Sequence, residues 1–312
     1  MNARAIARLA LITLVLAALL LIAGKIDLTS ARAAIAGLHP GWVALAIAVV
    51  LGAKLGAKVV RSQRALDDVA GSAAPRWPST ARLLIASHAA GQLAWAPLGF
   101  TVRTIALGAH GLSLGAIARV HVLERVAEAA ALAAIAALAL ACAPHAAGAM
   151  LAPGVTTVIA LAALAILAIV AATSRRARRA FTALRADRRT LAHVSAWSIV
   201  AGAADVAVVA LALAAAGQDP LALGLAPPLL AVLALNLACA VPVVPAQLGV
   251  QEAAIVLALA PAGVSTPAAL AAALAYRAAH VVPLVLVGLP ALASLGALRL
   301  RVRAPRPGLA AR

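Results

Sequence analysis

Residues 236–280 read NLACAVPVVPAQLGVQEAAIVLALAPAGVSTPAALAAALAYRAAH, and the fold is predicted outward from this stretch. It is strongly apolar, yet Pro242 and Pro245 remove backbone donors and interrupt a helix. Gly249 then permits a tight turn. Glu252 is therefore predicted to lie in the first turn of a new short helix, where the helix dipole favours an anion. A simple membrane anchor needs none of these features.

A second helix is predicted to begin just after Gly263. Ser265 can cap this helix, and Pro267 suits its first turn. Arg277 follows Pro267 by ten positions, which is about 15 Å along a helix. That depth is near the middle of a hydrocarbon core about 30 Å thick. A broken helix with a carboxylate and a guanidinium at this depth predicts a polar site inside a membrane protein.

The composition is typical of polytopic α-helical membrane proteins. Of the 312 residues, 65% are hydrophobic and only 11% are charged, and several apolar runs exceed the ~18 residues that mark a spanning helix. The formal net charge of +17 does not indicate a nucleic-acid partner, because the arginines fall between apolar runs, where cytoplasmic loops are expected. Cys142 and Cys239 lack metal-ligand spacing, and no metal or other cofactor is predicted.

The predicted fold is all-α, a membrane helical bundle of about six full spans plus two re-entrant broken hairpins, or about eight spans. Full spans are expected at roughly 5–24, 42–60, 113–142, 150–172, 191–215 and 267–298, the last bent at Pro283. Positive-inside counting places the N-terminus, the polar loops 61–82 and 173–190 and the C-terminal tail in the cytoplasm. The chain must then cross an even number of times between these loops. We therefore expect 83–109 and 226–261 to form hairpins that enter from opposite sides.

A single integral membrane domain is expected over 1–300, with a basic cytoplasmic tail over 301–312. Its halves, about 80–172 and about 191–298, share a Pro–Gly break that precedes a glycine with an arginine fourteen positions later. These glycine–arginine pairs are Gly111 with Arg125 and Gly263 with Arg277. The spacing suggests an inverted repeat of the kind that transporters use, or a chance similarity, because few other positions match.

Five charged residues within apolar helices are energetically costly: Glu124, Arg125, Glu128, Glu252 and Arg277. Each charge costs roughly 2.5–3.5 kcal/mol at a helix centre, so five unpaired charges would cost more than about 12 kcal/mol. This is comparable to the stability of a whole protein, so these residues must pair with one another or line water. They could form a polar binding site, or they could be ion pairs that only fix helix packing.

Arg103 follows the break at Pro97 and Gly99, at the start of a short helix, where the dipole disfavours a cation. An anion bound by Arg103 together with the free N–H groups would resolve this conflict, and a lipid phosphate is the obvious anion in a membrane. The alternative is an ion pair of Arg103 with Glu252 or Glu124.

Other polar residues in the spans have simpler interpretations. Lys54 and Lys58 share a helix face and are expected to extend toward the membrane interface. Asp205 is alone in its span, where it could relay protons or hydrogen-bond a neighbouring helix as a neutral acid. The histidines in apolar runs are expected to be packing residues, and among them only His280, three positions after Arg277, is of interest.

The sequence Pro245-Ala-Gln-Leu-Gly-Val-Gln-Glu252, with Tyr276-Arg277 on the following helix, resembles the lysylphosphatidylglycerol synthase transmembrane-region family, also called flippase-like domain proteins. The upstream half of the family pattern resembles Pro97, Gly99 and Arg103 followed by Glu124-Arg125. Four positions depart from the family pattern. Ala246-Gln247 replaces the usual paired glycines, Gln251 replaces a common arginine, and Phe100 stands where an acidic residue is frequent.

The resemblance implies a lipid-translocating membrane domain. Together with the charge distribution, it leads us to expect a bacterial inner-membrane protein with both termini cytoplasmic, and no catalytic residue is predicted. Larger synthases of this type carry a soluble aminoacyl-transferase domain that this chain is expected to lack. The implied partner is a membrane lipid with an anionic head group, a phospholipid or an isoprenoid lipid. The candidate substrate-binding residues are Arg103, Glu124, Arg125, Gly249, Glu252 and Arg277. Two alternatives stay open: a membrane-embedded enzyme acting on a lipid or isoprenoid head group, and a non-catalytic scaffold for envelope lipid synthesis.

Overall fold

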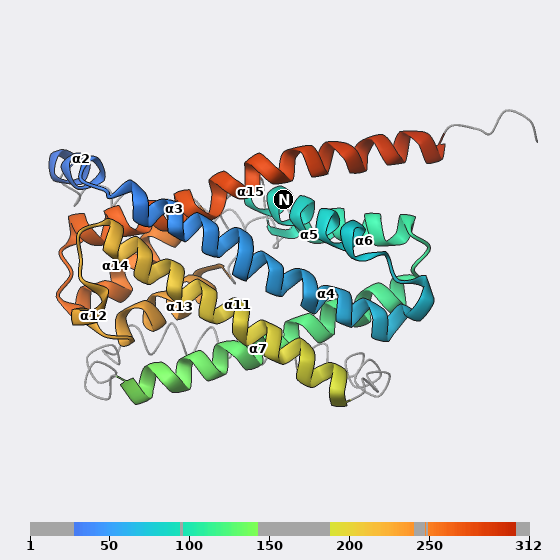
Figure 1. Cartoon of the computed structure of the whole chain (residues 1–312), viewed down its shortest axis with the longest axis horizontal. Helices are drawn as coiled ribbons and strands as arrows, with labels where there is room; N and C mark the ends of the chain where they lie inside the picture. Colours follow the sequence, from blue (N-terminus) through green and yellow to red (C-terminus); the bar gives the residue numbers. More distant parts are fainter. Residues whose placement is uncertain (1–27, 94–95, 143–187, 240–246, 248, 304–312) are drawn as a thin grey trace, which may run out of the picture.

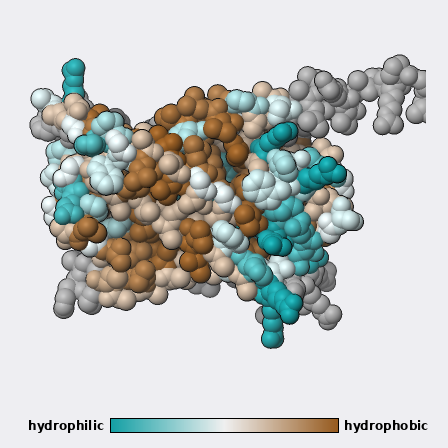
Figure 2. Space-filling view, in the orientation of Figure 1, coloured by the Kyte–Doolittle hydropathy of each residue, from teal (hydrophilic) through white to brown (hydrophobic). Residues whose placement is uncertain are grey.

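The computed structural model describes residues 28–93, 96–142, 188–239, 247 and 249–303, and every regular element within them is helical. Four helices in this part of the chain are long and apolar enough to cross a membrane: Pro40–Ala73, Leu114–Cys142, Arg188–Ala215 and Thr266–Ser294. Figure 2 shows hydrophobic side chains over the middle of the long axis and many of the hydrophilic ones toward its right-hand end. The fold is the predicted membrane helical bundle.

The elements follow in chain order (Figure 1). They are α2 (Leu28–Ala36), α3 (Pro40–Val49), a π-helical segment (Val50–Lys54), α4 (Leu55–Ala70), a 3-10 turn (Gly71–Ala73), α5 (Trp77–Leu93), α6 (Ala96–Ala109), α7 (Leu114–Cys142), α11 (Arg188–Ala215), α12 (Pro220–Leu223), α13 (Ala226–Cys239), α14 (Val250–Leu259), a second 3-10 turn (Ala260–Ala262) and α15 (Thr266–Arg303). The predicted spans 5–24 and 150–172 lie outside the described residues.

The first long helix extends well beyond its predicted end. From α3 through the π-helical segment to α4 it is continuous, and α5 begins at Trp77. The polar loop predicted at 61–82 is therefore wrong for residues 61–70 and 77–82. The polar sequence is misleading here because Arg61 and Ser62 are buried against other helices. Arg61 Nη1 donates to Ser198 Oγ of α11 at 3.2 Å, and Ser62 Oγ donates to Glu124 Oε1 of α7 at 2.7 Å.

Two pairs of short helices occupy the predicted broken hairpins. Helix α5 packs against α6, and α13 packs against α14. Helices α6 and α13 have 14 residues each and α14 has 10, which gives lengths of about 15–21 Å. These lengths fall short of a hydrocarbon core of about 30 Å, as expected for interrupted helices. Residues 94–95 and 240–246, at the two breaks, lie outside the described residues.

Glycines allow the first hairpin to pack tightly. A Cβ atom on Gly99 would lie only 2.5 Å from the carbonyl oxygen of Ser87 in α5. A Cβ atom on Gly288 of α15 would lie 2.3 Å from the Cβ of Ala89, also in α5. Glycine therefore permits close backbone approach at both contacts, as is common between helices in lipid.

Helix α15 begins where the sequence predicts. Gly263 has a φ of +75°, the carbonyl of Ser265 accepts from the N–H of Ala269, and Pro267 lies in the first turn. The helix continues past Pro283 and Pro290 to Arg303, three residues into the predicted tail. The buried apolar side chains of these helices form two clusters. One involves α3, the start of the π-helical segment, the C-terminal half of α7, α11, α13, α14 and α15. The other involves α4, α5, α6, the N-terminal half of α7 and the start of α11.

Candidate functional site

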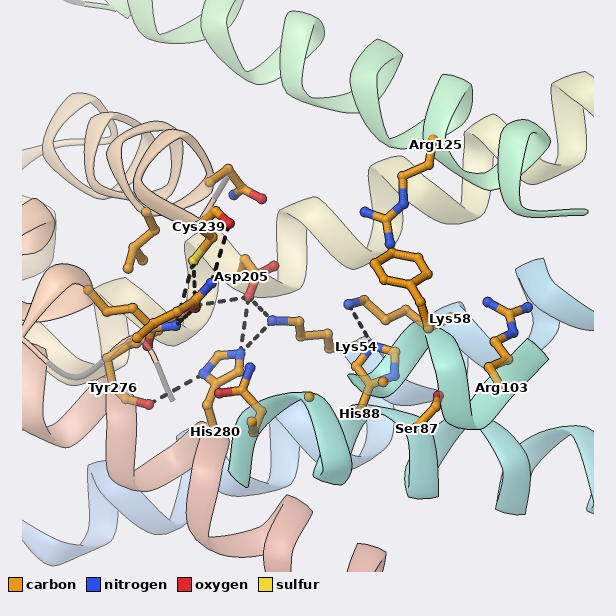
Figure 3. A pocket seen from close by; sticks show the side chains of 18 residues that line it. Lys54, Lys58, Ser87, His88, Arg103, Arg125, Asp205, Cys239, Tyr276 and His280 are labelled. Carbon is orange, nitrogen blue, oxygen red and sulfur yellow. Dashed lines mark hydrogen bonds and ion pairs between the residues drawn. The ribbon is translucent and has the colours of Figure 1, made fainter. Parts of the chain in front are cut away.

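A cavity of about 330 Å³ takes its lining from helices of both apolar clusters and from both hairpins (Figure 3). Its charged lining residues are Lys54, Lys58, Arg103, Arg125 and Asp205. Its neutral polar lining residues include Ser87, His88, Gln92, Asn236, Gln247, Gln251, Tyr276 and His280. A polar cavity within an apolar helical bundle is the type of site predicted from the sequence, although several of its residues were not predicted.

One side of the cavity holds a cluster around Asp205. Lys54 forms an ion pair with Asp205, and its Nζ lies 2.5 Å from His280 Nε2. The same imidazole nitrogen lies 3.2 Å from Asp205 Oδ1, and the hydroxyl of Tyr276 donates to that oxygen at 3.4 Å. Asp205 therefore contacts neighbouring helices, one of the two roles predicted for it, but it does so in an ion pair with Lys54 and not as a neutral acid. It joins the first long helix, α11 and α15.

Lys58 lies next to this cluster and contacts a histidine. Its Nζ lies 3.2 Å from His88 Nε2, while His88 Nδ1 lies 3.0 Å from the carbonyl oxygen of Leu84. A carbonyl can only accept, so Nδ1 carries the proton and Nε2 faces Lys58 as an acceptor. Both lysines point into the cavity (Figure 3), so the prediction that they extend to the interface is wrong.

Arg103 and Glu124 form a buried bidentate ion pair. Arg103 Nη1 donates to Glu124 Oε2 at 2.5 Å, and Nη2 donates to Oε1 at 2.7 Å. The two residues are only 6% and 2% exposed. Of the two predicted partners for Arg103, a lipid anion or a carboxylate, the structure shows the carboxylate. This pair connects α6 to the helix that follows it.

Arg125 lies at the exposed rim of the cavity. Its Nη1 lies 2.6 Å from Glu128 Oε2, and its guanidinium lies over the ring of Phe100 at 4.7 Å. Glu128 also pairs with Arg61 through Oε1 at 2.8 Å. The side chain of Arg125 is 59% exposed, so most of its surface stays accessible.

Glu252 and Arg277 form the second hairpin's ion pair. Arg277 Nε and Nη2 both contact the carboxylate, the latter at 2.9 Å, and Nη2 also donates to the carbonyl oxygen of Gln247 at 2.9 Å. Glu252 lies in the first turn of α14, as predicted, where it accepts from the N–H of Gly249 at 2.9 Å. This pair again connects a hairpin to the next long helix, with the charges exchanged relative to Arg103 and Glu124.

Comparison with known protein families gives one result that covers nearly the whole chain. The family model for the lysylphosphatidylglycerol synthase TM region matches residues 5–288. The chain belongs to this family. It is thus a multi-pass membrane protein of a family tied to lipid handling. No curated protein matches the chain.

Gln247 stands at one of the two positions where the family resemblance leads us to expect glycine, and its backbone conformation favours that residue. This residue has a φ of +52°, and Gly249 has a φ of +78°, so the segment requires two residues in conformations that favour glycine. The Gln247 side chain compensates for this conformation. Its Oε1 accepts from Gln251 Nε2 at 2.6 Å and from Cys239 Sγ at 3.0 Å, which links α13 to α14.

The predicted site residues of this family member occupy different places around the cavity. Arg103 and Arg125 line it, whereas Glu124 does not line it and forms an ion pair with Arg103. Gly249, Glu252 and Arg277 form a neighbouring cluster whose contact with the cavity runs through Gln247. Sequence reasoning missed Lys54, Lys58, His88 and Asp205 as lining residues. The available signal was electrostatic, because charges in several apolar spans must find partners within the bundle.

Proposed function

We propose that this family member moves an anionic amphiphilic lipid between the leaflets of the bacterial inner membrane. The observation that carries the proposal is the cavity of about 330 Å³, lined by four cations and one carboxylate inside an apolar helical bundle. Charged side chains are costly in a bilayer and are typically retained there where they bind a polar substrate or ion. A lipid head group is the polar substrate that a family tied to lipid handling suggests.

The rim of the cavity suits a lipid that enters from the bilayer. Phe100 and Leu98 of α6 are 40% and 42% exposed, close in sequence to lining residues, and Arg125 stacks on Phe100. The cavity volume is near the lower end of the about 300–1,000 Å³ typical of ligand pockets. Such a space can hold a head group while the acyl chains stay outside, in contact with the exposed apolar side chains.

Two ion pairs, one buried and one partly buried, give the hairpins defined attachment points. Arg103 attaches α6 to α7, and Arg277 attaches α14 to α15. Alternating access in transporters involves the movement of one part of the bundle against another around a fixed site. We therefore assign Arg103, Glu124, Glu252 and Arg277 as positioning residues that control this movement.

Lipid exchange between leaflets in proteoliposomes tests the proposal. Wild type, Arg277→Ala, Glu252→Gln and the exposed control Arg64→Gln would be compared, with fluorescent anionic and zwitterionic lipids and a dithionite quench, with and without a proton gradient. We expect faster exchange of the anionic lipid by wild type and the control, and none by the other two variants. Lipid extracts should stay chemically unchanged by mass spectrometry, because the proposed activity is transport.

Three results would contradict the proposal. A folded wild-type protein that exchanges no lipid under any of these gradients would contradict transport. Exchange at the wild-type rate by both folded variants would show that the Glu252–Arg277 pair only fixes helix packing. Conversion of the lipid to a new species would favour the membrane-embedded enzyme instead.

A further inference from the structure

Positive charge exceeds negative charge around the cavity. The four lining cations are Lys54, Lys58, Arg103 and Arg125, and Arg61 joins them through Glu128. In the described part of the chain, three carboxylates pair directly with these five cations: Asp205, Glu124 and Glu128. Two positive charges therefore lack a carboxylate of their own.

Lys58 carries one of these charges. Its ammonium group has three N–H donors, and the histidine at 3.2 Å is a neutral acceptor. Within the described ranges no carboxylate lies within 4 Å of its Nζ. An ammonium group with no counter-ion costs several kcal/mol in a low-dielectric environment. A bound anion would remove this cost.

Arg125 supplies the second charge. It shares Glu128 with Arg61, so one carboxylate serves two guanidiniums. Lys58 and Arg125 both lie in the wall of the same cavity (Figure 3), which Phe100, the residue under the Arg125 guanidinium, also lines. A lysine and an arginine in one cavity are a common means of binding phosphate, because the arginine supplies paired donors and the lysine a compact charge.

We infer that Lys58 and Arg125 bind a phosphate group with two negative charges, as in a phosphomonoester. Such a group would balance the excess charge, whereas a phosphodiester such as phosphatidylglycerol would balance only half of it. A lysyl ester of phosphatidylglycerol has two ammonium groups and one phosphate, and it would increase the excess. The substrate of this chain is therefore a phosphomonoester lipid and not an aminoacylated one. The phosphate site stands on the cavity alone, and its lipid source rests on the proposed function.

Binding to the purified full chain in detergent tests the inference without any need for transport. The probes are phosphatidic acid, phosphatidylglycerol, its lysyl ester, phosphatidylcholine, glycerol phosphate and inorganic phosphate. At pH 7 a phosphomonoester is mostly its dianion, because its second pKa is about 6. The variants are Lys58→Gln, Lys58→Arg and Arg64→Gln. The last removes the same charge from an exposed position on α4. Native mass spectrometry would measure affinity, and thermal unfolding would check folding.

We expect wild type to bind phosphatidic acid at least tenfold more tightly than phosphatidylglycerol. The lysyl ester should bind more weakly than phosphatidylglycerol. Lys58→Gln should lose about tenfold or more in affinity for phosphatidic acid, while Lys58→Arg and Arg64→Gln should stay within about twofold to threefold of wild type. The wild-type lipid preference is an independent measurement that stands even if Lys58→Gln fails to fold.

Several results would overturn the inference. Equal binding of phosphatidic acid and phosphatidylglycerol would refute the dianion, and tightest binding of the lysyl ester would refute an anionic site. An equal loss in Arg64→Gln would indicate surface attraction only. Glycerol phosphate that binds as tightly as phosphatidic acid would keep the phosphate site but refute a lipid source. If binding depends on Lys58 but no lipid exchanges between leaflets, the phosphate site is supported and only the proposed transport is contradicted.

Discussion

Lys54 and Lys58 lie one helical turn apart and line the same cavity, yet only Lys54 contacts a carboxylate among the described residues. Lys54 pairs with Asp205 of α11, whereas Lys58 contacts the imidazole of His88 in α5. Residues four apart on a helix have Cβ atoms about 5–6 Å apart, so the two ammonium groups repel each other unless each has a counter-charge. Lys54 therefore has a structural partner, and Lys58 stays available for a ligand.

Replacing only one member of the Lys54–Asp205 pair should destabilise the protein more than replacing both. We expect Asp205→Asn to lower stability by about 3–5 kcal/mol, because it leaves Lys54 as an uncompensated buried charge. The double variant Lys54→Met/Asp205→Asn should recover part of this loss, with a coupling energy of about 0.5–3 kcal/mol. Denaturant or thermal unfolding in detergent would measure the cycle. Strictly additive losses would show that the two groups do not interact.

The Arg103–Glu124 pair should be more important for stability than the hydroxyl that supports it. Glu124→Gln should cost about 3–5 kcal/mol, because the buried guanidinium of Arg103 loses its bidentate partner. Ser62→Ala should cost about 1.5–3 kcal/mol, because only one hydrogen bond to the carboxylate is lost. Unfolding of both variants in the same detergent provides the comparison. A larger loss for Ser62→Ala than for Glu124→Gln would contradict it.

The loop before α14 should be more sensitive to substitution at Gly249 than at Gln247, although both residues have positive φ angles. Gly249→Ala should destabilise by about 1–3 kcal/mol, because a Cβ atom is strained at a φ of +78°. Gln247→Gly should relieve strain at a φ of +52° but lose the contacts to Gln251 and Cys239, so its net effect should be smaller than about 1 kcal/mol. Thermal unfolding of both variants would check this order, and equal losses would contradict it.

Close packing of α15 on α5 should depend on Gly288. Gly288→Ala should destabilise by about 1–3 kcal/mol, because its Cβ would overlap the Cβ of Ala89. Gly108→Ala is the matched control within α6, since its Cβ would meet no atom within 4 Å. That control should be neutral or stabilising by up to about 1 kcal/mol, as alanine favours the helix. Similar losses in both variants would argue against a packing effect.

The fold was largely predictable because hydropathy and helix breakers act locally. The apolar runs predict the four described spans, and Pro97, Gly99, Pro245 and Gly249 predict both hairpin breaks. The end of the first long helix was mispredicted, because Arg61 and Ser62 look like loop residues and are instead buried against α7 and α11. Polarity predicts exposure only when no partner lies elsewhere in the chain.

The cavity was harder to predict because partner choice is a tertiary property. The family pattern identified Arg103, Glu252 and Arg277 as important, but it did not pair Lys54 with Asp205, which are 151 positions apart. It also did not show that Lys58 faces inward. A lysine near a predicted interface could extend to it or turn into the bundle, and only the position of α5 and His88 decides between these directions.

The π-helical segment Val50–Lys54 divides the first long helix at the level of the cavity. Ala46, which precedes the segment, and Val50 at its start pack into one apolar cluster, whereas Ala65 and Leu66, which follow it, pack into the other. A π turn interrupts the regular backbone ladder and is found at functional sites. We therefore expect this long helix to bend most easily at the π-helical segment, which ends at Lys54. A rotation of one apolar cluster relative to the other would bend the helix at this segment first. Such a bend would move Lys54, and with it the charged lining of the cavity.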